Sequence, residues 1–292
     1  MIKHQIRILK NERGTNMNII CEGKTFSQSY MDLVFTLMKQ GVTKAPRGQK
    51  ISHIQNCLFV VNEPGTVFSC DSRKYRTDYL NKELALYFSG DCSAEKFGEA
   101  SVFWLQLKNP DNETINSNYG YRIFYKPIES KFVKHSMTQW DYCKQQLLND
   151  KDTRQGLIFV SGDDVQFPEN KDFICTLTYC FNIENDKLNL TVNRRSQDLF
   201  FGLPYDYVWE YALLLKMHNE LKEKYPELQI GKYSMFCNNI HIYERNFETF
   251  KMMLADFSCG KYQDFDINEL INDDNKAFIY DKTYGTGDFK HE

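Results

Sequence analysis

The 292-residue sequence lacks any uninterrupted apolar run of about 18 residues, and its first residues form no apolar segment. We therefore expect no membrane-spanning helix and no secretory signal, and we expect a soluble protein of the cytoplasm. Repeats, low-complexity tracts and a Pro/Gly/Ser-rich linker are also missing. With 42% hydrophobic and 15% aromatic residues, the composition indicates a packed globular protein.

Neither sign of charge dominates the sequence, since 36 Lys and Arg stand against 39 Asp and Glu and the net charge is −3. A protein with no overall positive field is not expected to bind nucleic acid directly. An anionic ligand would instead need a local cluster of arginines.

The nine cysteines form no C-x-x-C pair, which argues against a zinc ribbon or a thioredoxin-like site. Their scatter is typical of reduced thiols in a cytosolic compartment. We expect no metal site. One of the thiols could be a nucleophile, and composition alone does not say which.

Apolar periodicity predicts helices and strands that do not alternate as regular βαβ units, which favours an α+β fold. The expected helices are 27–39, 77–88, 138–148, 207–224 and 247–257, and the expected strands are 51–61, 121–125, 156–160, 173–183, 188–192 and 233–243. Between the strands 173–183 and 188–192, Glu-Asn-Asp-Lys is typical of a hairpin turn. We divide the chain into an N-terminal extension (1–44), a catalytic domain (45–260) and a polar C-terminal tail (261–292).

A polar segment between an expected strand and an expected helix carries the strongest chemical signal. It reads Asn-Arg-Arg-Ser-Gln-Asp-Leu-Phe-Phe-Gly-Leu-Pro-Tyr-Asp over 193–206. The guanidinium of Arg195 and the hydroxyl of Ser196 are suited to binding a phosphate monoester. A solvated loop in which Asp198 or Asp206 caps the following helix explains the segment equally well.

Arg-Ser-x-Asp-x-x-x-Gly-x-Pro followed by an aromatic residue resembles the nucleotide-binding motif of thymidylate synthases and of the related phage deoxycytidylate hydroxymethylases. Other motifs of that family match in the same order along residues 45–257. They are the mobile phosphate loop at Arg47-Gly48, the catalytic glutamate at Glu83-Leu84, the substrate-cleft pair Tyr119-Gly120, Asp152-Thr153-Arg154, the nucleophile Cys175 twenty residues before Arg195, and the sugar-binding His241-Ile242-Tyr243.

This resemblance implies a thymidylate synthase-like fold, with a mixed β-sheet layered with helices and with sheets packed back-to-back in a homodimer. It further implies that Arg195, Ser196 and Arg47 bind the nucleotide phosphate together with Arg154, which is donated across the dimer interface. His241 and Tyr243 would hold the 3′-hydroxyl of the sugar.

Three departures from the synthases concern the chemistry. Ile174-Cys175-Thr176 replaces Pro-Cys-His and is similar to the hydroxymethylase branch, as is the string Ile-Asn-Ser-Asn-Tyr-Gly at 115–120. The second arginine of an Arg-Arg pair is Gln155, which puts one phosphate contact in doubt. Arg194 could compensate for it, or its side chain could point away along the strand.

The resemblance implies that 5,10-methylenetetrahydrofolate is the co-substrate. The C5 carbon of a pyrimidine is a poor nucleophile until a thiolate adds at C6, which is the role expected of Cys175. Glu83 would act through water as general acid and base. Asp198 would hydrogen-bond the pterin, with Gly202 and Trp104 near it. Without the resemblance, Cys175 and Trp104 would read as core residues and Glu83 as a surface helix residue.

Asp206 is the third departure, because the synthases have a pyrimidine-reading asparagine four residues after the motif glycine. Cytosine presents an N4 amine donor and an N3 acceptor, which a carboxyl group matches, whereas uracil presents the opposite pattern. Asp206 also precedes the expected helix, so it could cap that helix as well.

The expected activity is therefore transfer of a hydroxymethyl group to C5 of dCMP, with water adding to the methylene. Alternatives are a (d)CMP C5-methyltransferase or a thymidylate synthase, in which folate hydride completes the reaction, and a nucleotide-binding relative without catalysis. The ribose form of the substrate stays open. The phage branch implies a role in making precursors of modified DNA in the cytoplasm of a bacterial host.

Overall fold

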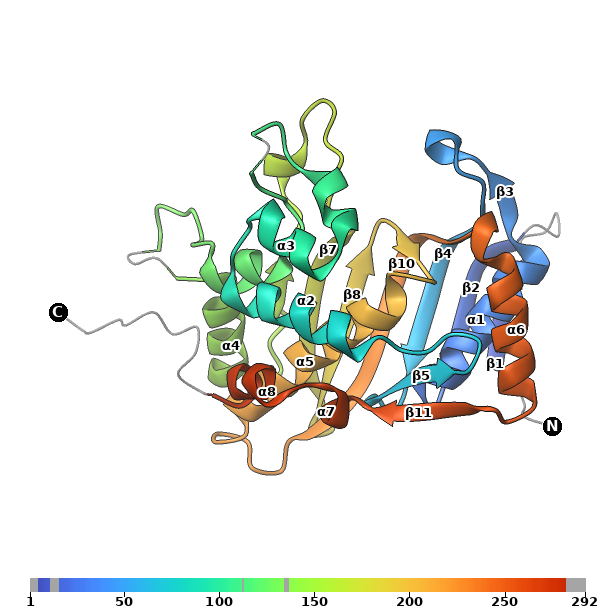
Figure 1. The fold of residues 1–292 in the computed structure, drawn as a ribbon. Coiled ribbons are helices and arrows are strands. Elements are labelled where there is room, and N and C mark those ends of the chain that lie inside the picture. The colour runs from blue at the N-terminus through green and yellow to red at the C-terminus, as the bar shows by residue number, and fades with distance from the viewer. Residues whose placement is uncertain (1–4, 11–15, 112, 134–136, 282–292) are drawn as a thin grey trace. The chain divides into compact units, whose positions relative to one another are not determined.

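The computed structural model describes residues 5–10, 16–111, 113–133 and 137–281 of the chain (Figure 1). The chain forms two compact units. Unit 1 comprises Met1–Arg76, Asn189–Tyr211 and Ile230–Leu270, and unit 2 comprises Thr77–Leu188, Ala212–Gln229 and Ile271–Glu292.

Unit 1 contains most of a mixed β-sheet, with the strand order β1-β2-β4-β10-β8. These strands are β1 (Gln5–Lys10), β2 (Asn16–Gly23), β4 (Ile51–Val61), β10 (Gln229–Tyr243) and β8 (Lys187–Arg194). β2 runs parallel to β4, and β4 runs antiparallel to β10. The short β3 (Val42–Lys44) pairs with β4 and β9 (Gln197–Asp198) pairs with β10. The apolar run at the end of β4 is buried, as its central place in this sheet requires.

The helices of unit 1 bury an aromatic core against this sheet. α1 (Phe26–Gln40) begins after the N-cap Thr25 and packs on β2 and β4, with α6 (Phe247–Ser258) beside it. Phe26 stacks on Tyr207 from the start of α5 (Leu203–Leu221), with ring centroids 4.4 Å apart. A separate two-stranded sheet joins β5 (Thr66–Cys70) to β11 (Tyr262–Asp266), and the turns η1 (Pro46–Gly48) and η5 (Glu244–Asn246) and the short α7 (Ile267–Leu270) complete the unit.

Unit 2 is mainly helical, and its core forms around Trp140. The indole ring of Trp140 packs against Phe124 and Phe181, and its N–H donates to Glu220 at 3.0 Å. The elements are α2 (Thr77–Ser89), α3 (Ala94–Ala100), η2 (Val102–Leu107), η3 (Tyr121–Tyr125), α4 (Gln139–Asn149), β6 (Leu157–Phe159), η4 (Asp163–Val165), β7 (Thr176–Glu184) and α8 (Asp273–Tyr280). β6 pairs antiparallel with β7.

Most expected elements are confirmed to within a few residues. The strand 51–61 matches β4, and the helix 77–88 matches α2. The hairpin turn is confirmed by Asn185 and Asp186, which both adopt a positive φ. Between Lys261 and Asp281, which we assigned to a polar tail, the chain forms β11, α7 and α8, and Phe278 stacks on Phe88 at 4.2 Å. The domain boundaries at 45 and 260 stay a prediction.

One expectation was wrong, and one expected helix begins earlier than the sequence indicated. Residues 121–125 form a π-helix rather than a strand, because the side chain of Asn118 accepts the backbone N–H of Tyr121 and starts a helical turn. Aromatic residues favour strands only weakly, and this local cap outweighs them. The helix expected from 207 begins at Leu203, with Pro204 in its first turn, where a missing N–H costs nothing.

The α+β class is confirmed by the mixed sheet and the helices around it. No helix within the described ranges is long and apolar enough to cross a membrane. The homodimer stays a prediction.

Candidate active site

The motif that follows β8 is placed by backbone pairing with β10. β9 runs parallel to β10, with Gln197 opposite Ile240 and Asp198 opposite His241. Just before β9, the backbone carbonyl of Arg195 accepts the N–H of Asn239 in β10 at 3.2 Å. The segment expected to bind phosphate therefore lies beside the strand that carries the His-x-Tyr motif.

Asp198 shapes the loop between β9 and α5. One carboxylate oxygen accepts the backbone N–H of Phe200 at 2.9 Å, and the other accepts that of Phe201 at 3.2 Å. Burial raises the pKa of this carboxyl group, and the two backbone donors oppose the rise. Each oxygen has a further lone pair beyond these bonds, and contact with a pterin stays a prediction for Asp198.

Asp206 lies inside the first turn of α5 and does not cap the helix, so that expectation was wrong. Its backbone N–H bonds to the carbonyl of Gly202 at 3.0 Å. Its Oδ2 accepts two side-chain hydrogen bonds, one from Nη1 of Arg194 at 2.9 Å and one from Nε2 of Gln197 at 2.8 Å. The side chain of Asp206 keeps 19% of its surface exposed, whereas that of Arg194 keeps 1%.

Arg194 points into the interior of unit 1, where its second nitrogen bonds to Glu210. Tyr233 donates its hydroxyl to the other oxygen of Glu210 at 2.6 Å. Burial raises the pKa of Glu210 to about 7, with Asp206 adding to the rise and Arg194 opposing it. Because Arg194 is buried and bonded to two carboxylates, it does not take over the phosphate-binding role of the arginine that Gln155 replaces.

His241 is buried next to Tyr243, and the two rings meet edge-to-face at 5.3 Å. Burial lowers the pKa of His241 to about 4, and the nearby His53 and Arg195 lower it further, against a hydrogen bond with the backbone of Asn239. The imidazole is therefore neutral at pH 7. A neutral imidazole can both donate and accept a hydrogen bond, as holding a sugar hydroxyl requires.

The arginines at 47 and 154 are both exposed to solvent. Arg47 lies in the turn η1 with a φ of 52°, and Gly48 follows with a φ of 76°. In the left-handed region glycine is favoured, so Gly48 explains why the turn can form there. Gln155, next to Arg154, accepts the hydroxyl of Tyr142 at 2.9 Å. The phosphate roles of Arg47 and Arg154 stay predictions.

Within unit 2, Glu83 is buried on the inner side of α2, with 8% of its surface exposed. Tyr79, one turn earlier, donates its hydroxyl to Glu83 Oε1 at 2.7 Å, and Tyr87 lies at 3.4 Å from the same oxygen. Reading Glu83 as a surface glutamate was therefore wrong. The ring of Tyr119 packs on Tyr87 at 5.4 Å, which brings the expected substrate-cleft tyrosine next to the glutamate's partner.

Cys175 is half-buried and stands immediately before β7. Its Sγ lies 4.0 Å from the carbonyl oxygen of Phe173. The following Thr176 is fully buried. Cys180 lies within β7, where burial raises the pKa of its thiol.

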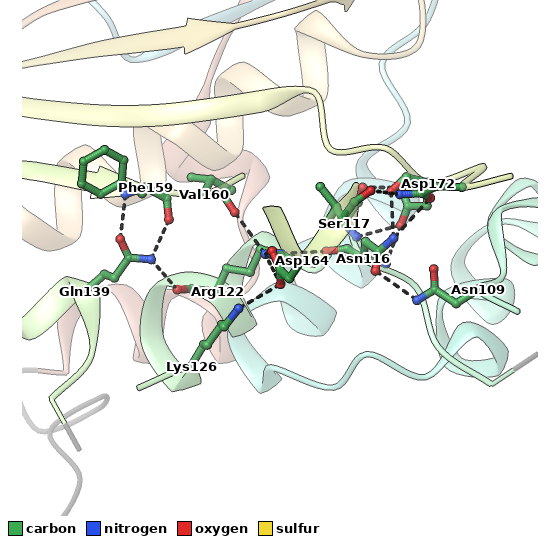
Figure 2. Close-up of polar contacts among 12 residues, drawn as sticks. Asn109, Asn116, Ser117, Arg122, Lys126, Gln139, Phe159, Val160, Asp164 and Asp172 are labelled. Carbon is green, nitrogen blue, oxygen red and sulfur yellow. Dashed lines mark hydrogen bonds and ion pairs between the residues drawn. The ribbon is translucent and has the colours of Figure 1, made fainter. Parts of the chain in front are cut away.

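Asp172 links the segment before Cys175 to the Asn-Ser-Asn string (Figure 2). Its Oδ2 accepts the backbone N–H groups of Asn116 and Ser117 at 2.6 and 2.7 Å, and its Oδ1 accepts the hydroxyl of Ser117. Burial raises the pKa of Asp172 in spite of these donors. The network continues through Arg122, whose side chain bonds to the Asn116 carbonyl and pairs with Asp164 at 3.1 Å.

Trp104 in η2 is buried, with its ring edge-on to Phe97 at 5.0 Å. Its indole N–H finds no hydrogen-bond partner within the part of the chain that the structure describes. A buried tryptophan usually satisfies this donor, so a ligand that accepts it fits here.

Sequence reasoning missed four residues that support these side chains, namely Gln197, Glu210, Tyr79 and Asp172. Tyr79 lies four residues before Glu83, and residues at this spacing share one face of a helix, so the sequence could have indicated Tyr79 as a partner of Glu83. The other three depend on contacts between distant segments, and no spacing rule indicates them.

Comparison with known proteins places the chain in a family. The family model "Thymidylate synthase" matches residues 28–286, so the chain belongs to the thymidylate synthase family. It is an enzyme of folate-dependent one-carbon transfer.

Particular relatives include phage and bacterial enzymes. The deoxycytidylate 5-hydroxymethyltransferase of Enterobacteria phage T4 is 29% identical over 236 residues, which cover 78% of this chain and 90% of that protein. The deoxyuridylate hydroxymethyltransferase of Bacillus phage SP01 is 24% identical over 76% of this chain and 58% of that protein. A thermostable thymidylate synthase A from Bacillus subtilis shares the fold, with a TM-score of 0.62 and 19% identity over 82% of this chain and 85% of the other.

Proposed function

We propose that this enzyme is a deoxycytidylate 5-hydroxymethyltransferase, which converts dCMP to 5-hydroxymethyl-dCMP with 5,10-methylenetetrahydrofolate as co-substrate. The observation that carries the proposal is the carboxylate of Asp206, held by Arg194 and Gln197 at the position where the synthases have an asparagine. The 29% identity to the T4 deoxycytidylate enzyme over most of the chain supports the same substrate.

Asp206 selects cytosine through its free acceptor capacity. Both of its side-chain hydrogen bonds end at Oδ2, and Oδ1 accepts none from any residue in the described ranges. Oδ1 is suited to accept the N4 amine of cytosine. The O4 atom of uracil is an acceptor and would face a second acceptor there, a mismatch that can reduce turnover by about 10⁴-fold.

In this proposal Cys175 supplies the nucleophile that adds to C6 of the base and makes C5 nucleophilic. The folate, when bound, supplies the one-carbon unit, and Trp104 and Asp198 offer it a free indole donor and a half-buried carboxyl group. Glu83, fixed by the hydroxyl of Tyr79, moves protons through water at the reacting centre. Water then adds to the exocyclic methylene carbon, and Cys175 leaves C6.

The nucleotide's phosphate binds to Arg195, Ser196 and Arg47, and His241 and Tyr243 hold the 3′-hydroxyl. Arg154 acts from the partner subunit of a homodimer, which agrees with its exposure in a single chain. The phage relatives support a place for the reaction in the cytoplasm of a bacterial host, where the product serves as a precursor of modified DNA.

Mass analysis of the nucleotide product tests the proposal. Purified enzyme is incubated with methylenetetrahydrofolate and either dCMP or dUMP. The proposal predicts that dCMP gains one CH₂O and that the folate ends as tetrahydrofolate. A product that gains only CH₂, together with dihydrofolate absorbance, identifies a methyltransferase, and turnover of dUMP without dCMP contradicts the base assignment.

A further inference from the structure

Asp206 has an asymmetric set of partners. Two side-chain donors reach Oδ2, from Arg194 at 2.9 Å and from Gln197 at 2.8 Å. In the described part of the chain nothing donates to Oδ1. The two donors are buried, at 2% and 3% exposure, while Asp206 itself remains partly open to solvent.

Gln197 has one amide orientation that fits this position. Its Nε2 donates to Asp206 Oδ2 and also lies 3.2 Å from the backbone carbonyl of Asp198. Its Oε1 is buried and accepts no hydrogen bond from the residues that the structure describes. Turning the amide over would place Oε1 against two acceptors, so the donor end must face the carboxylate.

The space for this contact depends on Gly202. A Cβ atom at position 202 would lie 2.5 Å from Nε2 of Gln197 and 3.3 Å from Oδ2 of Asp206. Any larger residue would push the amide away from the carboxylate. Glycine is therefore needed at this position of the motif for a contact within the chain itself, whether or not folate is bound.

Arg194 is fixed from its other side. Glu210 accepts a hydrogen bond from the second guanidinium nitrogen, and the hydroxyl of Tyr233 donates to the other oxygen of Glu210 at 2.6 Å. The side chains of Glu210 and Arg194 are both at most 1% exposed. Because Arg194 is bonded to two carboxylates in the interior, it cannot move with Asp206 if that side chain rotates. The guanidinium therefore fixes the position of Oδ2.

We propose that Gln197 and Arg194 are positioning residues for base selection, which hold Oδ2 of Asp206 so that Oδ1 alone is offered to the exocyclic amine of the nucleotide. This inference rests on the proposed function. An unrestrained carboxylate can rotate about its Cβ–Cγ bond and turn its edge away from the base. With both donors on Oδ2, the acceptor for cytosine is set before the nucleotide binds.

Binding constants for dCMP and dUMP, measured by calorimetry, test the inference without requiring turnover. Gln197→Leu removes the amide donor, and Gln263→Leu, at an exposed position of β11, is the matched control. We expect the preference for dCMP over dUMP to fall about tenfold to a hundredfold in Gln197→Leu, the range of one hydrogen bond to a charged group. The control should keep the wild-type preference.

A double-mutant cycle separates positioning from general damage. In an Asp206→Asn background, Gln197→Leu should leave the preference between the two nucleotides unchanged, because the carboxylate it positions is gone. Arg194→Lys, which keeps the charge but loses the planar fork, should give an intermediate preference. These results would support the inference.

An unchanged preference in Gln197→Leu would overturn the inference, as would a further drop in the Asp206→Asn background. Equal weakening of dCMP and dUMP binding would also overturn it, since it would indicate only a disturbed loop. The proposed function fails separately, if the wild-type enzyme turns over dUMP and not dCMP. If Arg194→Lys does not fold, Gln197→Leu alone decides the question.

Discussion

Replacing His241 by asparagine should change how the stability of this enzyme depends on pH. His241 is 9% exposed, and its pKa falls from the ordinary 6.5 to about 4, mainly because of burial. The unfolded chain therefore binds a proton at this residue between those two pH values, while the folded chain does not. The free energy of unfolding that this difference contributes is fully present above pH 6.5, and it is lost as the pH falls from 6.5 through the folded-state pKa of about 4.

The size of this effect follows from the shift. The difference of 6.5 and about 4 is roughly 2.5 pKa units, and each unit corresponds to about 1.4 kcal/mol. His241 should thus account for about 3 kcal/mol of the stability that disappears between pH 7 and pH 4. The change is large, because the whole free energy of unfolding of a native protein is only about 5–15 kcal/mol.

Urea unfolding at closely spaced pH values, at one protein concentration, measures this contribution. His241→Asn should be less stable than wild type at pH 7, because it loses packing with Tyr243, yet it should lose about 3 kcal/mol less on acidification. Tyr243→Phe is the control, since it alters the neighbouring ring without removing a group that titrates in this range. Parallel curves for wild type and His241→Asn would refute the reasoning.

Three further predictions concern unit 2. Cys175→Ala should bind dCMP but abolish exchange of its C5 hydrogen with solvent, and unchanged exchange would rule out this thiol as the nucleophile. Tyr79→Phe removes a 2.7 Å hydrogen bond to Glu83, so kcat should fall about tenfold with little change in KM in steady-state assays; an unaltered kcat would show that the bond is dispensable. Asp172→Ala leaves one buried and one part-buried backbone donor unpaired and should lower the free energy of unfolding by about 2–4 kcal/mol, whereas a decrease under about 1 kcal/mol would contradict its linking role.

The local signals in the sequence were sufficient to predict most of the helices and strands. Thr138 caps α4, and the apolar run of β4 is buried, as periodicity and capping rules indicate. The π-helix at 121–125 was missed because the cap contributed by Asn118 competes with the strand preference of the aromatic and branched residues there. The start of α5 was missed because the local pattern does not distinguish a proline in a first helical turn from a proline in a loop.

Within the candidate site, the family resemblance indicated which motifs to compare, and the pairing of β9 with β10 brings the Arg-Ser motif next to the strand that carries His241. Side-chain direction was not predictable. For Arg194 the sequence allowed either a phosphate contact or a side chain that turns away, and only the buried Glu210 shows that it points inward. Such a choice depends on a partner sixteen residues away in a different element, which no local rule encodes.

The central claim is that Asp206 makes this enzyme choose cytosine. Competition between dCMP and dUMP in one reaction, for wild type and for Asp206→Asn, measures the ratio of the two kcat/KM values directly. The account predicts that wild type consumes dCMP at least about a hundredfold faster than dUMP and that Asp206→Asn loses or reverses this preference. A wild-type enzyme that prefers dUMP, or an Asp206→Asn variant with the wild-type ratio, would contradict it.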